Sequence, residues 1–138
     1  MINTEIQMYI PDFSKFNLDG TFDKVSKHLE TSIKRNFAEG GRPNTWALKK
    51  DGTPSHLFKT GKLFGSITSG FTKGVEAWAG IENAANVPYA FAQNFGYAPR
   101  NLVAREFVLF QKEDEEYILE EFENAIVQFW TTQKQEVK

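Results

Sequence analysis

The stretch HLFKTGKLFGSITSG, residues 56–70, combines the glycines, hydroxyls and lysines from which phosphate-binding loops are built. A Walker-type loop needs Gly, four residues and then Gly-Lys-Ser/Thr, so that backbone amides surround the phosphates and the hydroxyl reaches Mg²⁺. Around Gly61 and Lys62, His56 stands at the first glycine position and Leu63 at the hydroxyl position. No serine of the stretch has the flanking glycines of a Gly-x-Ser-x-Gly nucleophile elbow. The stretch therefore predicts neither a nucleotide site nor a serine hydrolase.

The other side chains suited to catalysis or metal binding are two histidines and a run of carboxylates. His28 falls on the polar side of an expected helix and His56 in a loop, so we expect both to be exposed and without a metal. The run EDEEYILEEFE, residues 113–123, favours a solvated helix face over a general acid/base pair. The absence of Cys excludes disulfides and cysteine nucleophiles. The sequence predicts no enzyme and no cofactor or metal.

The composition is that of one globular domain, residues 1–138, with 41% hydrophobic and 14% aromatic residues. No segment approaches the roughly 20 apolar residues of a membrane span, and the N-terminus lacks the pattern of a signal peptide. We therefore expect no membrane partner and a protein made and kept in a cytoplasm.

Charge is distributed unequally along the chain. Between Lys34 and Lys73, eight basic residues stand against two acidic ones, whereas from Gln111 to Lys138 three basic residues stand against eight acidic ones. Regions of opposite sign suit head-to-tail packing of identical subunits, and the alternative is that each is a solvated face.

Periodicity predicts an α+β fold with a small, mostly antiparallel sheet of three or four strands. Residues 4–10 alternate as a strand does, and KLFGSITSGF with GVEAWAGI predicts a hairpin in which Leu63, Ile67 and Phe71 share one face and Val75 begins the second strand. Two longer helices should pack on one face of the sheet. The first begins near Thr21 and stops at Gly40-Gly41, and its apolar stripe is Phe22, Val25, Leu29, Ile33 and Phe37.

A short helix is expected in VPYAFAQNFG, and a long amphipathic helix from Glu113 to about Thr131. Residues Thr131–Lys138 should fray. Between the first helix and the hairpin, Glu39–Thr60 predicts a long basic loop, which is typical of a functional segment. We expect Trp46 to anchor it, and the candidate interface or DNA-facing residues are Arg35, Arg42, Trp46, Lys49 and Lys50.

The order of short motifs from about Ile33 to Ile126 resembles the Mu G-like bacteriophage virion-morphogenesis or tail-completion family. The residues that carry the resemblance form the patterns TG-x-L-x-x-SI, YA…G and AR-x-F: Thr60, Gly61, Leu63, Ser66, Ile67, Tyr89, Ala90, Gly96, Ala104, Arg105 and Phe107. The chain has Gln93-Asn94 where many relatives have His-Gln, and Val103 and Glu106 where they have prolines.

The resemblance implies a structural protein of the virion, assembled in the cytoplasm of the bacterial host. It would complete the tail or join it to the head, as a ring of subunits in contact with other tail or head–tail connector proteins. The charge of the loop also suits a weak, salt-sensitive contact with DNA. The alternative function is a nucleic-acid-associated accessory protein that uses the same basic loop.

Overall fold

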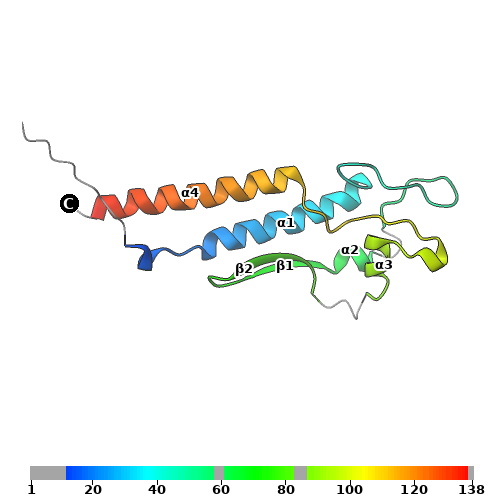
Figure 1. Ribbon diagram of the computed structural model, residues 1–138, viewed down its shortest axis with the longest axis horizontal. Helices are drawn as coiled ribbons and strands as arrows, with labels where there is room; N and C mark the ends of the chain where they lie inside the picture. Colours follow the sequence, from blue (N-terminus) through cyan, green and yellow to red (C-terminus); the bar gives the residue numbers. More distant parts are fainter. Residues whose placement is uncertain (1–11, 58–60, 83–86, 137–138) are drawn as a thin grey trace, which may run out of the picture.

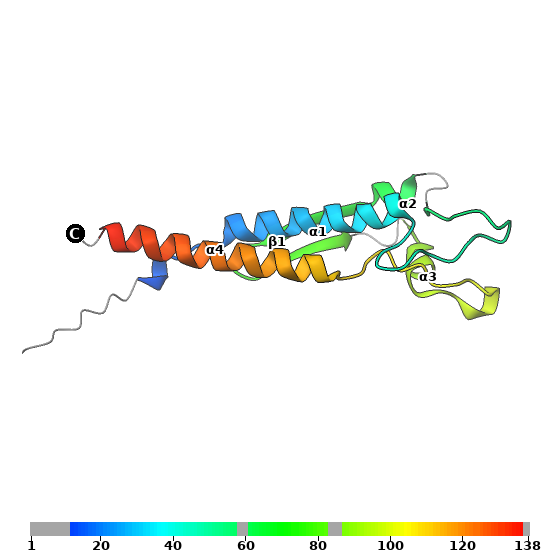
Figure 2. The ribbon, with the colours of Figure 1, turned by 90° about the horizontal axis from the view of Figure 1, so that it is seen from above.

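The computed structural model of the chain describes residues 12–57, 61–82 and 87–136. It is an elongated molecule in which two long helices run side by side in opposite directions and a β-hairpin lies along the first of them (Figures 1 and 2). The elements are η1 (Phe13–Lys15), α1 (Asp19–Glu39), α2 (Lys62–Gly65), β1 (Ile67–Thr72), β2 (Glu76–Ile81), α3 (Ala90–Phe95), η3 (Ala98–Arg100) and α4 (Lys112–Glu136). The expected α+β class is confirmed. The strand expected at residues 4–10 lies outside the described residues.

Helix α1 follows the predicted apolar stripe. Val25, Ile33 and Phe37 are buried. The helix begins slightly earlier than expected, at Asp19, whose amide donates to the Asn17 side chain at 2.8 Å. It ends at Gly40, whose left-handed φ of 69° suits a residue without a Cβ.

Strands β1 and β2 form the described sheet, a two-stranded antiparallel hairpin with Ile67 opposite Ile81. Both long helices lie on one side of it, and α1 is the helix in contact with the strands (Figure 1). On the other face, Trp78 stands opposite Gly70, where a Cβ would lie 2.8 Å from the indole Cζ2. The glycine therefore makes room for the indole ring across the strand pair.

The start of the expected hairpin is a helical turn and not a strand. Helix α2 lies just before β1, and the hydroxyl of its C-cap residue, Ser66, donates to the Leu63 carbonyl at 2.6 Å. One helical turn buries Leu63 and also sets Phe64 edge-on to Phe37 with 5.5 Å between ring centroids, which an alternating strand could not do. Val75, expected in the second strand, lies in the exposed turn.

Helix α4 packs antiparallel along α1. The rings of Phe22 and Phe122 meet edge to face at 5.8 Å, and Lys24 pairs with Glu121 at 3.8 Å. The helix continues to Glu136, through most of the segment from Thr131 that was expected to fray. No described helix is both long and apolar enough to cross a membrane.

The hydrophobic core lies toward the C-terminal end of α1 and includes side chains from both hairpin strands, α2, α3 and the segment before α4. Its buried members are Ile33, Phe37, Trp46, Leu63, Ile67, Val87, Ala90 and Phe107. Short helix α3 was expected, and Gly96 ends it with a φ of 82°. The core thus fixes the end of the molecule from which the long loop emerges.

Candidate interaction site at the loop end

The predicted loop and most motif residues meet at one end of the molecule, beyond the C-terminus of α1. This region, called here the loop end, comprises residues 40–57, 61–66 and 87–111 (Figures 1 and 2). Much of it is irregular in backbone, so its shape depends on side-chain contacts to carbonyls and carboxylates. Those contacts decide which predicted residues are available to a partner.

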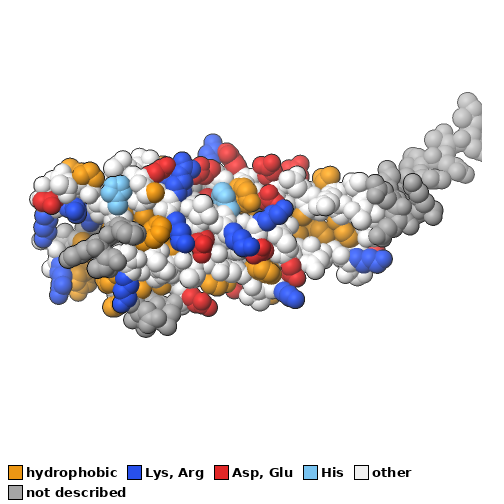
Figure 3. Space-filling model, turned by 180° about the vertical axis from the view of Figure 1, so that it is seen from behind, with side chains coloured by type: hydrophobic (Ala, Val, Ile, Leu, Met, Phe, Trp, Pro, Cys, Tyr) orange, Lys and Arg blue, Asp and Glu red, His pale blue; other side chains and the backbone are white. Residues whose placement is uncertain are grey.

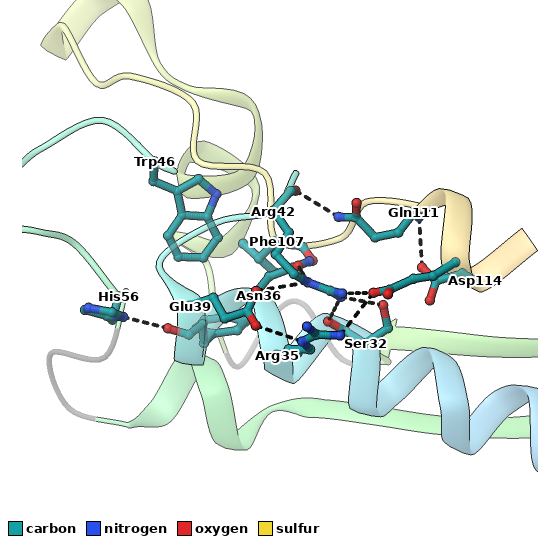
Figure 4. Close-up of polar contacts among 12 residues, drawn as sticks. Ser32, Arg35, Asn36, Glu39, Arg42, Trp46, His56, Phe107, Gln111 and Asp114 are labelled. Carbon is teal, nitrogen blue, oxygen red and sulfur yellow. Dashed lines mark hydrogen bonds and ion pairs between the residues drawn. The ribbon is translucent and has the colours of Figure 1, made fainter. Parts of the chain in front are cut away.

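Arg42 is turned inward and holds the start of the loop to both long helices (Figure 4). Its Nε donates to Asn36 Oδ1 at 2.8 Å, and its Nη2 donates to the carbonyl and hydroxyl of Ser32, each at 2.7 Å. Its Nη1 pairs with the carboxylate of Glu113 at the start of α4. Burial, and next the nearby Arg35 charge, lower the pKa of Arg42. The expectation that Arg42 faces a partner is therefore wrong, because its guanidinium is used inside the chain.

Two amide side chains extend this connection. The Asn36 Nδ2 donates to the Phe107 carbonyl at 2.8 Å, and the Gln111 Nε2 donates to the Arg42 carbonyl at 2.8 Å. Both amides are buried, so a lost partner would leave a polar group without water. The segment before α4 is thus fixed to α1 and to the start of the loop (Figure 4).

Trp46 anchors the loop, as predicted, but does so from the core. Its side chain is buried, its ring meets Phe37 edge to face at 5.9 Å, and its Nε1 donates to the Glu106 carbonyl at 3.1 Å. A buried indole cannot also contact DNA or a neighbouring subunit. The interface role expected for Trp46 is therefore corrected to a structural one.

The motif arginine, Arg105, also serves the loop. It is buried, and it donates from Nε to the Ala47 carbonyl and from Nη2 to the Leu48 carbonyl, both at 3.0 Å. Its own amide donates to the Gln93 carbonyl at 2.8 Å. Through its side chain and its backbone amide, Arg105 therefore connects the middle of the loop to α3.

The other motif residues gather around the same core. Leu63, Ile67, Ala90 and Phe107 are members of it. Gly61, with a φ of 77°, precedes α2. At Gly96 a Cβ would lie 3.0 Å from the Ala104 amide nitrogen. Ser66 was expected to pair within the sheet, but it follows α2 as the C-cap residue. Tyr89 and Ala104 are exposed, and Thr60 lies outside the described residues.

Of the predicted interface residues, Lys49, Lys50 and Arg35 keep exposed side chains. Arg35 pairs with Glu39 at 2.9 Å and with Glu113 at 3.3 Å. Part of the excess charge of the basic and acidic regions is therefore neutralised within the chain. Lys49 and Lys50 precede a tight turn. Within it, hydrogen bonds donated by the Thr53 hydroxyl and amide lower the pKa of the Asp51 carboxyl. Lys and Arg side chains gather at this end in Figure 3, whereas most Asp and Glu side chains on that face lie over the helices.

Sequence reasoning missed an exposed aromatic pair on α3. The Phe91 and Phe95 side chains are 73% and 61% exposed, and their rings touch at 4.7 Å between centroids. Asn94, on the inner side of α3, accepts the amides of Phe107 and Val108, each at 3.0 Å. The signal in the sequence is the i, i+4 spacing of two phenylalanines on a helix whose other face already carries Ala90.

The expectation of two unremarkable histidines is wrong for His28. Its Nε2 lies 2.9 Å from Oδ1 of the buried Asp114, and its ring stacks on Tyr117 at 3.9 Å. Asp114 was expected on a solvated face, but it also accepts the Gln111 amide at 2.8 Å and so caps α4. His56 is exposed, and its Nδ1 lies 2.9 Å from the Phe37 carbonyl.

A cavity of about 970 Å³ opens at the loop end. Its polar lining side chains include Lys49, His56, Gln93 and Arg105, and no carboxylate is among the described residues that line it. No group of three or more His, Cys, Asp or Glu side chains suited to a metal occurs in the described ranges. The lining supplies positive charge and apolar surface. Comparisons of the chain with protein-family profiles, curated proteins and solved structures find no match.

Proposed function

We propose that this chain is a structural component of a bacteriophage or prophage particle. It completes the tail or joins it to the head, through contacts with other copies of itself and with neighbouring tail or connector proteins. Its place is the virion, after assembly in the host cytoplasm. The sequence motifs support this proposal as a resemblance, and the described surface supports it independently.

The observation that carries the proposal is a pair of separate apolar surfaces on one elongated chain. The first, the aromatic surface, is Phe91 and Phe95 on α3. The second, the α4 surface, is Leu119 and Ile126, which lie on one face of the helix and are 62% and 50% exposed. Scattered apolar residues are normal on monomers, but paired large side chains on two elements are typical of contact surfaces. Two such surfaces allow a subunit to hold a neighbour on each side.

The loop gives this proposal a mechanism. Lys49 and Lys50 are exposed on a loop whose base is fixed by Arg42, Trp46 and Arg105. A loop held at several points loses less entropy when it docks than a free one. We propose that its lysines reach a neighbouring subunit or DNA in the lumen of the particle.

The alternative function, a nucleic-acid-associated accessory protein, rests on the same two lysines. Filter binding over a salt series separates the two functions, because neutralised phosphates give a steep fall of log affinity with log salt concentration. A dedicated DNA binder would show tight, steeply salt-dependent binding by the isolated chain. A structural subunit with only a passing contact would show weak binding even in low salt.

Electron microscopy of lysates tests the proposed function. The gene is deleted from the phage or prophage that encodes it, and the chain is supplied again from a plasmid as the control. Full heads separated from tails, or tails with aberrant ends or lengths, are expected, and the plasmid should restore particles. Intact infectious particles in normal numbers without the gene would overturn the proposal.

A further inference from the structure

We infer that the aromatic surface of one copy receives the α4 surface of the next copy, in a head-to-tail contact. This inference rests on the proposed function, because it names the surfaces through which the subunits of an assembly would meet. The occupant of the aromatic surface is thus an acidic amphipathic helix that the chain itself supplies.

The aromatic surface is built in advance of any partner. The Phe91 and Phe95 rings contact each other at a tilt of 47° on the outer side of α3, and the inner side is fixed by the side-chain Oδ1 of Asn94, which accepts the Phe107 and Val108 amides. The short helix is therefore held to the core while its two rings point to solvent. A pre-organised aromatic pair loses little entropy on binding, which is why such residues dominate the affinity of interfaces.

The α4 surface has the spacing of a helix that docks on another surface. Phe122 and Tyr117 face α1, where they contact Phe22 and His28. Leu119 and Ile126 lie seven residues apart, which is about 10.5 Å along the helix axis, and they stay exposed. The apolar face of α4 is therefore wider than the face that α1 covers. Anchors at i and i+7 are the pattern of a helix that docks on an apolar surface.

Charge favours the pairing of these two surfaces. Glu116, Glu120 and Glu123 are exposed on α4 next to its apolar surface. Lys49, Lys50 and Arg100 are exposed at the loop end near α3. None of these six side chains makes an ion pair within the described part of the chain. The exposed carboxylates on α4 and the exposed cations at the loop end are therefore of opposite sign, which favours this pairing over contacts between like surfaces.

The shape of the molecule prevents one copy from satisfying both surfaces itself. Helix α3 lies at the loop end, and α4 runs away from it toward the opposite end of the molecule (Figures 1 and 2). The contact must therefore join two copies. Because the two surfaces differ, two joined copies still have one free aromatic surface and one free α4 surface between them. Further copies can add at either surface, and the assembly closes as a ring or continues as an open chain.

Two double variants, each with one altered surface, test the inference. Phe91→Ser with Phe95→Ser alters the aromatic surface, and Leu119→Ser with Ile126→Ser alters the α4 surface. Val75→Ser is the matched control, because Val75 is 71% exposed at the hairpin turn, outside both surfaces. Sedimentation velocity of the full chain gives the assembly state, and circular dichroism confirms that each variant is folded.

The wild type and the control should assemble beyond a dimer. Each double variant alone should be monomeric, with association weakened at least about tenfold. An equimolar mixture of the two double variants should form a one-to-one dimer, because one intact junction remains between them. Double variants that assemble as the wild type does, or a mixture that stays monomeric while the wild type assembles, would overturn the inference.

A cross-link tests the same contact without removing it. The chain has no Cys, so Phe95→Cys combined with Ile126→Cys gives an unambiguous thiol pair. Oxidation should yield ladders of disulfide-linked copies, and monomers without a ladder would contradict the inference. A wild type that is monomeric at every concentration would also overturn it, whereas the proposed function is decided separately by the gene deletion.

Discussion

The imidazole Nε2 of His28 lies 2.9 Å from Oδ1 of Asp114, and this pair joins the middle of α1 to the first turn of α4. The same carboxylate accepts the Gln111 amide through its other oxygen, so the residue that holds the helices together also begins the second one. Its burial shows that the acidic run of α4 is not uniformly solvated. The inner carboxylate is structural, and its neighbour Glu113 pairs with Arg35 and Arg42.

Asp114→Ala should destabilise the fold. It leaves the Gln111 amide without its acceptor and His28 without its partner, and losses of a helix cap and a charge-assisted hydrogen bond together cost roughly 2–4 kcal/mol. Urea unfolding measures the free energy of unfolding. Glu116→Ala, on the exposed side of the same helix, is the control and should change it by less than about 0.5 kcal/mol. Equal effects of the two substitutions would refute the assigned role of Asp114.

Arg42→Lys should cost more stability than Arg35→Lys, although both arginines pair with Glu113. An ammonium cannot reproduce the fork that reaches Asn36, Ser32 and Glu113 together. We expect a loss of about 2–3 kcal/mol for Arg42→Lys, and less than about 1 kcal/mol for the exposed Arg35. Thermal and urea unfolding of both variants check this. A larger loss at Arg35 would show that the inward arrangement is wrong.

Gly41→Ala should displace the start of the loop. A Cβ there would lie 2.6 Å from the Asn44 carbonyl oxygen and 2.7 Å from the Trp46 amide nitrogen, both backbone atoms, and φ is +110°. Gly52→Ala is the control, since its φ is also positive, at +82°, but nothing lies within 4 Å of its Cβ. We expect a cost of about 1 kcal/mol at Gly52 and a clearly greater one at Gly41. The difference in melting temperature measures it, and equal shifts would count against the close packing of Gly41.

Lys49→Glu combined with Lys50→Glu should leave the fold intact and reduce assembly. Both side chains are exposed, so the free energy of unfolding should change by less than about 0.5 kcal/mol. Reversed charge should repel the acidic side of α4 in a neighbouring copy. Ring formation and the yield of infectious particles are the readouts. Lys15→Glu with Lys73→Glu, at exposed sites away from the loop end, is the matched control, and unchanged assembly in the loop variant would eliminate the loop mechanism.

The periodic elements could be predicted from the sequence because their pattern is local. The stripe from Phe22 to Phe37 predicts α1, the alternation around Ile67 predicts the hairpin, and the acidic start predicts α4. Trp46 could be predicted as an anchor because it is a large apolar residue in a polar segment. Helix α2 could not, since Phe64 suits either a strand or a helical turn until its partner Phe37 is known.

The polar interior could not be predicted for a physical reason. Arg42, Arg105 and Asp114 belong to residue types that are mostly exposed. Arg105 and Asp114 are buried and Arg42 is turned inward because each has a partner from a distant part of the chain. Glu113 lies 71 positions from Arg42, and Ala47 lies 58 positions from Arg105. Periodicity carries no information on such pairs. Of the five residues predicted at an interface, Lys49, Lys50 and Arg35 are the ones whose side chains stay exposed.

Quantitative mass spectrometry of gradient-purified particles tests the central claim most directly. A structural subunit of the tail or of the head–tail junction should be present in every purified particle at a small, fixed copy number relative to the major tail protein. It should also stay with the particles through high-salt washing, because the proposed contacts are apolar at their centre. Its absence from purified particles, or its loss in salt together with free DNA, would contradict the account and favour the nucleic-acid function.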